Sequence, residues 1–446
     1  MKLPLIIFLF ILISADSSSQ KVWTLENCID YALENNIQIK RNQLLSETAR
    51  NNFNQSRLNV LPGIGAQVNH DLNSGRALNT DTYQWENREF EQGSLGAQAQ
   101  MNIFNGLQGY NNTQQQRYLL LSSLEDVERA MNDISMRIAS AYFQILLDME
   151  LVDIAGNQLK ASILEMESAR SNFQLGNISR GGLLEIESQV ASNDYQLTLA
   201  QNNLSSSYLT LKQIMQLDHD LDFEIHRPEI GSINESAMLS RVDAIYDQAE
   251  TILPQVRGAE YFLRSAERGL ASARGMQSPR LTVRGTYYSR YSELAMDPLT
   301  GGSYSYPAQI KDNQYKQLSF SLIVPIFDGW RVRSRISNSK IAVLDARYQL
   351  DAVRQELYSD IHQMHNEARN ALNRYNSAEK ASLSAEEAFN FAQQQFRLGL
   401  INFVDFQLSQ SNLFSAQSNM AQAKYEYYLR SMILDFYRGE AIAMDN

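Results

Sequence analysis

The stretch from Trp330 to Leu398 contains neither proline nor glycine. As a single α-helix its roughly 70 residues would run for about 100 Å at about 1.5 Å per residue. Few globular domains hold a helix of that length. Such a helix needs neighbours along most of its course, so the chain is not expected to divide into ordinary compact domains.

The apolar residues of this stretch recur at spacings of three and four. From Leu350 to Ala378 their mean spacing is about 3.5 residues, which is typical of a coiled-coil seam. Leu124 to Val152 repeats the pattern with the same mean spacing. The flanking residues are mostly polar. The sequence therefore predicts two long helices that pack against neighbouring helices.

The two halves of the chain resemble each other at a fixed offset. Asn102–Gly106 (NIFNG) matches Pro325–Gly329 (PIFDG), and Phe173–Ile178 (FQLGNI) matches Phe396–Ile401 (FRLGLI) at the identical separation in residue number. Two motifs that share one offset indicate a tandem duplication. Each half reads as helix, strand, long loop, strand, long helix, tight turn and helix, with a first repeat at 21–230 and a second at 231–446. The long helices are expected at about 107–175, 183–217, 330–398 and 403–437.

Four segments alternate between apolar and polar residues, as strands with two different faces do. They are expected at about 64–72, 94–104, 281–291 and 317–327. Each is about 9–11 residues long, enough to cross a membrane as a tilted strand. Alternation alone also fits a soluble sheet with one buried side, and that alternative stays open at this point.

A count of strands then implies several copies of the chain. Transmembrane barrels have at least about eight strands, and an open sheet edge is too costly in lipid. Two, three or four chains would supply about 8, 12 or 16 strands. Because a barrel of about eight strands is filled by its own side chains, a pore favours three or more chains.

The start of the chain indicates export. A basic start at Lys2, an apolar run and the small residues Ser14 and Ala15 together predict a secretory signal peptide over residues 1–20. The single cysteine, Cys28, is expected to be unpaired. The formal net charge of −11 argues against a nucleic-acid partner, since phosphate neutralisation needs a basic face.

Three segments carry a resemblance to the TolC-like outer-membrane efflux family. Trp23–Asn36 resembles the first helix of that family, and Pro325–Gly329 resembles its strand-to-helix junction. Gly399–Phe406, with the Gln- and Ala-rich helix that follows, resembles its second hairpin tip. The resemblance covers essentially the whole chain after the signal peptide.

The resemblance implies a mixed α and β membrane protein: a trimeric 12-stranded transmembrane β-barrel continued by a long α-helical coiled-coil barrel in the periplasm. The loops at 73–93 and 292–316 would then face outside the cell. The implied function is that of an exit duct in a tripartite efflux or type I secretion system, with a periplasmic adaptor protein and an inner-membrane pump or ABC transporter as partners.

Two tight turns are the candidate adaptor contacts. Gly176 and Gly399 stand where helix ends need a left-handed residue, and Ser179 and Asn402 stand where N-caps belong. An ordinary helical hairpin explains these residues equally well. The resemblance adds the contact with the adaptor and extends it to eight residues: Leu175, Gly176, Ile178, Ser179, Leu398, Gly399, Ile401 and Asn402.

The resemblance also places a pore constriction at the second tip. Asp405 matches an aspartate that lines the closed entrance in family members, although by position it could also be a capping-box acid. A second acid of the family is replaced by Leu408. A Tyr and an Arg that lock the entrance in some members correspond to Phe396 and Ile401, so we predict a more apolar lock here.

Other function classes find little support in the sequence. His362, His365 and Glu367 have a spacing that could hold a metal, but no further ligand set appears. Phosphate-binding, dinucleotide-binding and hydrolase motifs are absent, so neither an enzyme nor a cofactor is expected. The main alternative is a trimeric coiled-coil structural or adhesive envelope protein without a pore. A periplasmic adaptor is less favoured, because adaptors carry one helical hairpin rather than two.

Overall fold

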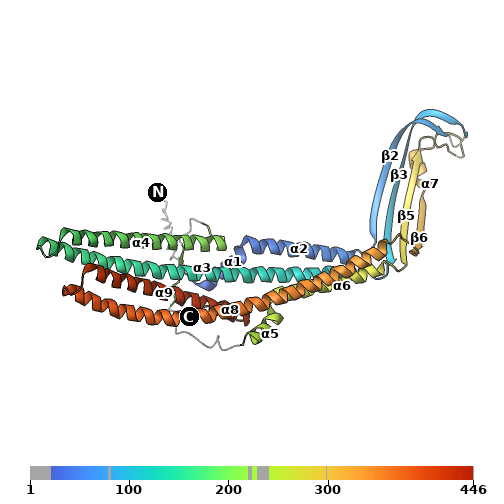
Figure 1. Ribbon diagram of the computed structural model, residues 1–446. Coiled ribbons are helices and arrows are strands. Elements are labelled where there is room, and N and C mark those ends of the chain that lie inside the picture. Colours follow the sequence, from blue (N-terminus) through green and yellow to red (C-terminus); the bar gives the residue numbers. More distant parts are fainter. Residues whose placement is uncertain (1–21, 79–81, 219–222, 229–240, 298, 445–446) are drawn as a thin grey trace, which may run out of the picture. The chain divides into compact units, whose positions relative to one another are not determined.

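The computed structural model describes residues 22–78, 82–218, 223–228, 241–297 and 299–444 (Figure 1). The predicted signal peptide lies outside them. The chain forms two compact units, each assembled from separate stretches. One contains residues up to 41, 129–252 and from 356 onward, and the other contains residues 42–128 and 253–355. The first is the helical unit below, and the second is the sheet unit.

The sheet unit is built on four antiparallel strands in the order β2-β3-β5-β6. These are β2 (Gly63–Leu78), β3 (Trp85–Phe104), β5 (Arg280–Ser292) and β6 (Tyr315–Ile323). The middle pair, β3 and β5, comes from opposite halves of the chain. The sheet therefore joins the two predicted repeats through their strands.

The register gives the sheet one apolar and one polar face. Val68 pairs with Leu95, and Val283 pairs with Phe320, so the apolar rows of neighbouring strands coincide. On the opposite face, Arg284 Nη2 donates to Gln100 Oε1 at 2.6 Å. This alternation confirms the period-2 reading of the four segments.

Most of the apolar face is uncovered in the single chain. Val68 and Phe320 are 80% and 68% exposed. Within the described ranges, the short helix α7 (Tyr306–Asp312) covers the C-terminal end of β5, where Ser289 Oγ donates to the backbone oxygen of Ile310 at 2.8 Å. An uncovered apolar surface of this kind marks a contact with lipid or with another chain.

Two expectations about the strands were wrong. The predicted loop at 73–93 is mostly strand, because β2 and β3 continue as a hairpin in which Leu78 pairs with Trp85. The last predicted strand ends at Ile323 rather than 327, since Pro325 has no N–H to donate to a sheet. The loop predicted at 292–316 contains α7.

The long helices are close to their predicted positions. Helices α3 (Gln108–Gln174) and α8 (Arg331–Arg397) have 67 residues each. Their first residues and their last residues are separated by the same offset as the repeated sequence motifs, while the repeat boundaries themselves stay a prediction. Helices α4 (Arg180–Met215) and α9 (Phe403–Tyr437) return from them. None of the helices described is both long and apolar enough to cross a lipid bilayer.

The helical unit holds two antiparallel hairpins, α3 with α4 and α8 with α9, each using only part of its first helix (Figure 1). The predicted seams are confirmed, because Ile138 and Ile145 on α3 and Ile361 and Ala368 on α8 are fully buried. Smaller elements complete the two units. The helical unit includes α1 (Leu25–Asn35), α5 (Val242–Ile252), β1 (Val22–Trp23) and β4 (Glu224–Ile225). The sheet unit includes α6 (Pro254–Gly275) and most of α2 (Ile37–Leu58), from Asn42 onward.

Candidate functional site: the hairpin tips

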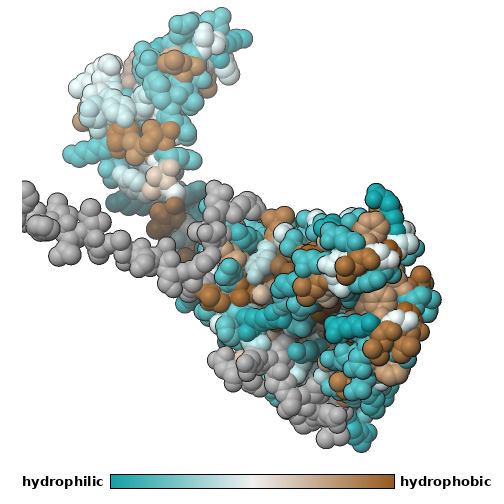
Figure 2. Space-filling view, turned by 90° about the vertical axis from the view of Figure 1, so that its left-hand side faces the viewer, coloured by the Kyte–Doolittle hydropathy of each residue, from teal (hydrophilic) through white to brown (hydrophobic). Residues whose placement is uncertain are grey.

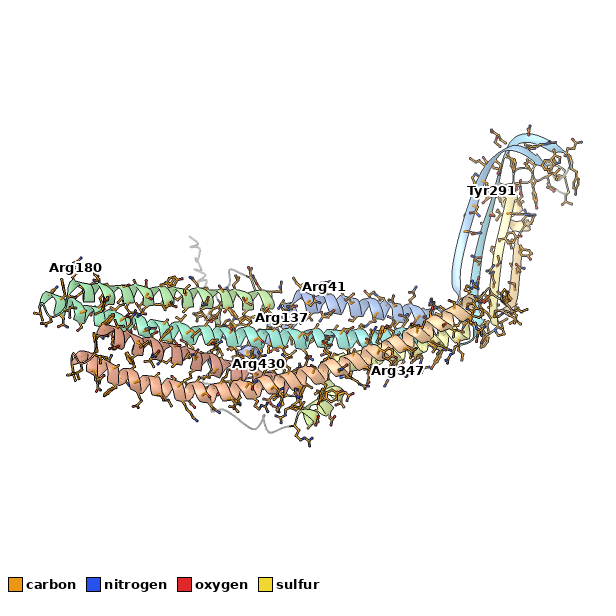
Figure 3. The ribbon with its side chains drawn as sticks, viewed as in Figure 1. Arg41, Arg137, Arg180, Tyr291, Arg347 and Arg430 are labelled. Atoms are coloured by element: carbon orange, nitrogen blue, oxygen red, sulfur yellow. The ribbon has the colours of Figure 1, made fainter. Side chains whose placement is uncertain are left out.

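The first tip turns between α3 and α4 through a left-handed glycine. Gly176 has a φ of +77°, and its N–H donates to the Phe173 oxygen at 3.0 Å. The next amide, of Asn177, donates to the Asn172 oxygen at 2.8 Å, which completes a Schellman motif. The Ser179 hydroxyl then accepts from the Gly182 amide at 3.2 Å and caps α4, whose first residue is Arg180 (Figure 3).

The second tip has the same construction. Gly399 has a φ of +72°, and its N–H donates to the Phe396 oxygen at 3.0 Å. The Leu400 amide reaches back to the Gln395 oxygen at 2.9 Å. Asn402 caps α9, because its side-chain oxygen accepts from the Asp405 amide at 2.9 Å. The predicted turn glycines and N-caps are thus confirmed at both tips.

The tips present a mixed surface. Figure 2 views the molecule from the side that Figure 1 shows at its left, where apolar patches lie among hydrophilic residues. Leu175, Leu398 and Leu400 are all exposed large apolar side chains at the turns. Gly176, Gly399 and Asn402 are exposed beside them, while Ile178, Ser179 and Ile401 range from exposed to half-buried. The tips thus offer apolar contacts that this single chain leaves open.

Asp405 lies exposed in the first turn of α9. Its backbone amide is capped by Asn402, but among the described residues no donor returns to its carboxylate, as a complete capping box requires. The carboxylate still lies close to the positive end of the helix dipole. In the single chain it is open to solvent.

The three apolar residues predicted at the constriction occupy different surroundings. Phe396 stacks on the ring of Phe406, with centroids 4.8 Å apart, and Phe406 is only 1% exposed. Phe389 and Phe403 extend this cluster. Leu408 is exposed and Ile401 half-buried. Phe396 thus packs between α8 and α9 of the second hairpin. The sequence alone did not predict this contact.

Polar side chains also form a layer between the two hairpins, which no pattern in the sequence predicts. The Gln407 side-chain amide on α9 donates to Gln189 on α4, and Gln189 donates to Asn193 at 2.9 Å. On α3, burial raises the pKa of Glu165 to about 7, although Arg397 on α8 opposes the shift. One Glu165 oxygen is buried without a hydrogen bond. The side chains between the hairpins thus combine amide hydrogen bonds with a buried carboxylate oxygen that has no partner.

The histidines and the cysteine have local roles. His362 Nδ1 lies 3.0 Å from Asn366 Nδ2, and Glu367 pairs with Arg430 at 3.0 Å. Within the described ranges no three His, Cys, Asp or Glu residues gather at metal-binding distance. Cys28 is free and buried as predicted. Burial raises the pKa of the Cys28 thiol to about 12, so the thiol stays protonated.

The chain matches the family described as outer membrane efflux protein over residues 28–215 and 245–440. The chain belongs to this family. The family consists of channel proteins of the outer membrane, which confirms the resemblance drawn from the sequence and the outer-membrane location.

Curated relatives of this outer membrane efflux protein include proteins named TolC from several bacteria. The TolC of Vibrio cholerae is 22% identical over 297 residues, which are 66% of this chain and 65% of that protein. The TolC of Escherichia coli K12 is 20% identical over 448 residues, covering 97% of this chain and 85% of that protein. The alkaline protease secretion protein AprF of Pseudomonas aeruginosa is 21% identical over 323 residues, covering 72% of this chain and 64% of that protein.

Solved structures share the fold at lower identity. The outer membrane protein VceC of Vibrio cholerae has a TM-score of 0.77 at 14% identity and covers 94% of this chain and 96% of its own. The outer-membrane channel OprN has a TM-score of 0.75 at 15% identity, covering 93% and 89%. The arrangement of helices and strands is therefore that of known outer-membrane channels.

Proposed function

We propose that three copies of this outer-membrane efflux protein form one passive exit duct. The four-stranded sheets would join into a 12-stranded barrel in the outer membrane, and the helical units would continue it as a tunnel in the periplasm. An inner-membrane pump or ABC transporter would supply the energy and a periplasmic adaptor would connect the two. Substrates would cross the periplasm and the outer membrane without chemical change.

The uncovered apolar face of the sheet carries this proposal. In lipid, the face would be covered by acyl chains, and the polar row that includes Arg284 and Gln100 would face water. The outer strands β2 and β6 each have one edge that no described strand pairs with. An open edge is prohibitively costly in lipid. Pairing β2 of one copy with β6 of the next closes the ring and removes every edge.

The hairpin tips are proposed as the adaptor contact and as the pore entrance. Their exposed leucines, Leu175, Leu398 and Leu400, would pack against a helical hairpin of the adaptor. Three Asp405 carboxylates around one axis would make an anionic constriction that favours cations. Asp405 has no competing hydrogen-bond donor among the described residues, which leaves it free for this role.

The constriction is tested by planar-bilayer conductance of the purified protein. The Asp405→Asn variant should keep discrete channels but lose much of their cation selectivity. Asp194→Asn is the matched control, since Asp194 is an exposed acid in the middle of α4. Unchanged selectivity in Asp405→Asn would remove Asp405 from the pore while the conduit stands. A protein that stays soluble without detergent and never conducts would favour the helical structural protein instead.

A further inference from the structure

A band of the sheet unit, here called the collar, lies where the four strands meet their helices. It comprises residues 50–62, 104–117, 264–280 and 324–340. The pairing of Arg280 with Ile323 and of Leu281 with Phe104 brings these strand ends to one edge of the sheet. The collar helices contact each other across the chain: Thr113 on α3 donates to the Ser56 oxygen at 3.0 Å.

The collar is strongly basic in an acidic protein. Its four segments contain eleven Arg and Lys residues and two acids, Glu267 and Asp328, whereas the whole chain has a net charge of −11. All the basic side chains except Arg268 are exposed. Among the residues that the structure describes, no carboxylate pairs with the three arginines that open α8. The basic residues are Arg50, Arg57, Arg117, Arg264, Arg268, Arg274, Arg280, Arg331, Arg333, Arg335 and Lys340.

Two large apolar residues of the collar have a left-handed backbone conformation and an exposed side chain. Leu107 has a φ of +60° and Trp330 a φ of +72°, a region that bulky residues rarely adopt. They are 62% and 61% exposed and precede the first turns of α3 and α8. A strained conformation that exposes an apolar side chain indicates a contact outside the single chain.

The collar thus combines exposed apolar anchors with exposed cations. The Arg333 guanidinium lies over the Trp330 ring, 4.3 Å from its centroid, so the two features are adjacent. Phe327 and Ile326 are exposed just before them. Aromatic residues beside arginines are typical of the boundary between hydrocarbon and headgroups, where the ring enters the apolar layer and the cation meets phosphate.

We propose that the collar binds the headgroups of anionic phospholipids in the periplasmic leaflet of the outer membrane. This inference rests on the proposed function, which puts the sheet in that membrane. Arg331, Arg333 and Arg335 hold the phosphates, while Trp330 and Leu107 anchor the helix starts in the acyl region. Binding there fixes the depth of the sheet and the level at which the helices leave the membrane.

The test measures which lipid stays bound to the detergent-purified protein. Native mass spectrometry is done after addition of equal amounts of phosphatidylglycerol and phosphatidylethanolamine. Wild type should retain phosphatidylglycerol preferentially. The variant Arg331→Gln/Arg333→Gln/Arg335→Gln should lose this preference. The ratio of bound phosphatidylglycerol to bound phosphatidylethanolamine should fall by about fivefold for each removed cation that contacts a headgroup. The control Lys160→Gln/Arg369→Gln/Lys380→Gln removes three exposed cations outside the collar and should behave as wild type.

Conductance of the same samples separates the two proposals. If wild type conducts but retains both lipids equally, the collar proposal is overturned and the channel stands. If the control loses the preference as much as the collar variant, the binding is a general effect of charge and the proposal also fails. If wild type neither inserts nor conducts, both proposals fail together.

Discussion

Replacing glycine by alanine should have opposite effects at the two hairpin tips: Gly399→Ala should destabilise the second tip, and Gly181→Ala should stabilise the first. Gly399 has a φ of +72°, and a methyl group added there would meet no atom within 4 Å. The cost of Gly399→Ala is therefore conformational only. A left-handed L-residue costs about 1–2 kcal/mol, so the hairpin tip should open about 5- to 30-fold more often.

Gly181→Ala, in the first turn of α4, is the matched control. Gly181 lies inside the helix, and an added methyl group would make an ordinary contact of 3.6 Å with Ser179 Oγ. Alanine stabilises a helix by about 0.5–1 kcal/mol relative to glycine. This variant should make opening of the first tip about two- to fivefold rarer. Gly399→Asn should fall between wild type and Gly399→Ala, because asparagine tolerates the left-handed region.

Amide hydrogen exchange of the purified protein measures these local openings. Peptides that cover 394–406 and 172–184 should show opposite changes in the two alanine variants, while peptides from the middle of α8 stay unchanged. Equal exchange in Gly399→Ala and wild type would refute the argument that backbone conformation, rather than space, requires glycine at the tip.

Three further predictions concern the helical unit. Burial gives Glu165 a folded pKa of about 7, above its unfolded value, so folding favours the protonated form. Stability should fall as pH rises from about 4.5 to 7, by about 1–2 kcal/mol after allowance for partial exposure, and Glu165→Gln should abolish this slope in thermal unfolding. A slope that persists in the variant would assign it to other groups. Ile361→Ala should cost about 2–5 kcal/mol in denaturant unfolding, because Ile361 is fully buried in the α8 seam; a loss below about 1 kcal/mol would contradict that packing. Phe396→Ala and Ile401→Ala should each raise closed-state conductance if the entrance lock is apolar, and unchanged conductance in both would reject that lock.

The long helices could be predicted to within a few residues. Proline and glycine are absent from α8, which allows its length to be predicted. The regular spacing of its apolar residues identifies its buried seam, so local sequence also predicts its packing. The turn glycines and N-caps could also be predicted, because left-handed turns and capping hydrogen bonds require particular residue types. Gly399 and Asn402 are found where these rules put them.

The remaining features depend on contacts between distant residues. The extension of β2 past Leu72 and the start of β3 before Ser94 were missed because residues 73–93 are mostly polar, and backbone pairing rather than an apolar face defines those parts of the strands. The stack of Phe396 on Phe406 spans the turn, outside any helical spacing. The Gln189–Gln407 bond joins the two hairpins, 218 residues apart in sequence. No periodicity within one segment contains such information.

The number of chains in the functional particle tests the central claim most directly. A four-stranded sheet with two open edges must find partners before it can cross a membrane, and three copies are proposed to close it. Light scattering of the detergent-extracted protein, corrected for bound detergent, should give three chains per particle in the fraction that conducts. A conducting particle with one or two chains, or a water-soluble monomer, would contradict the account.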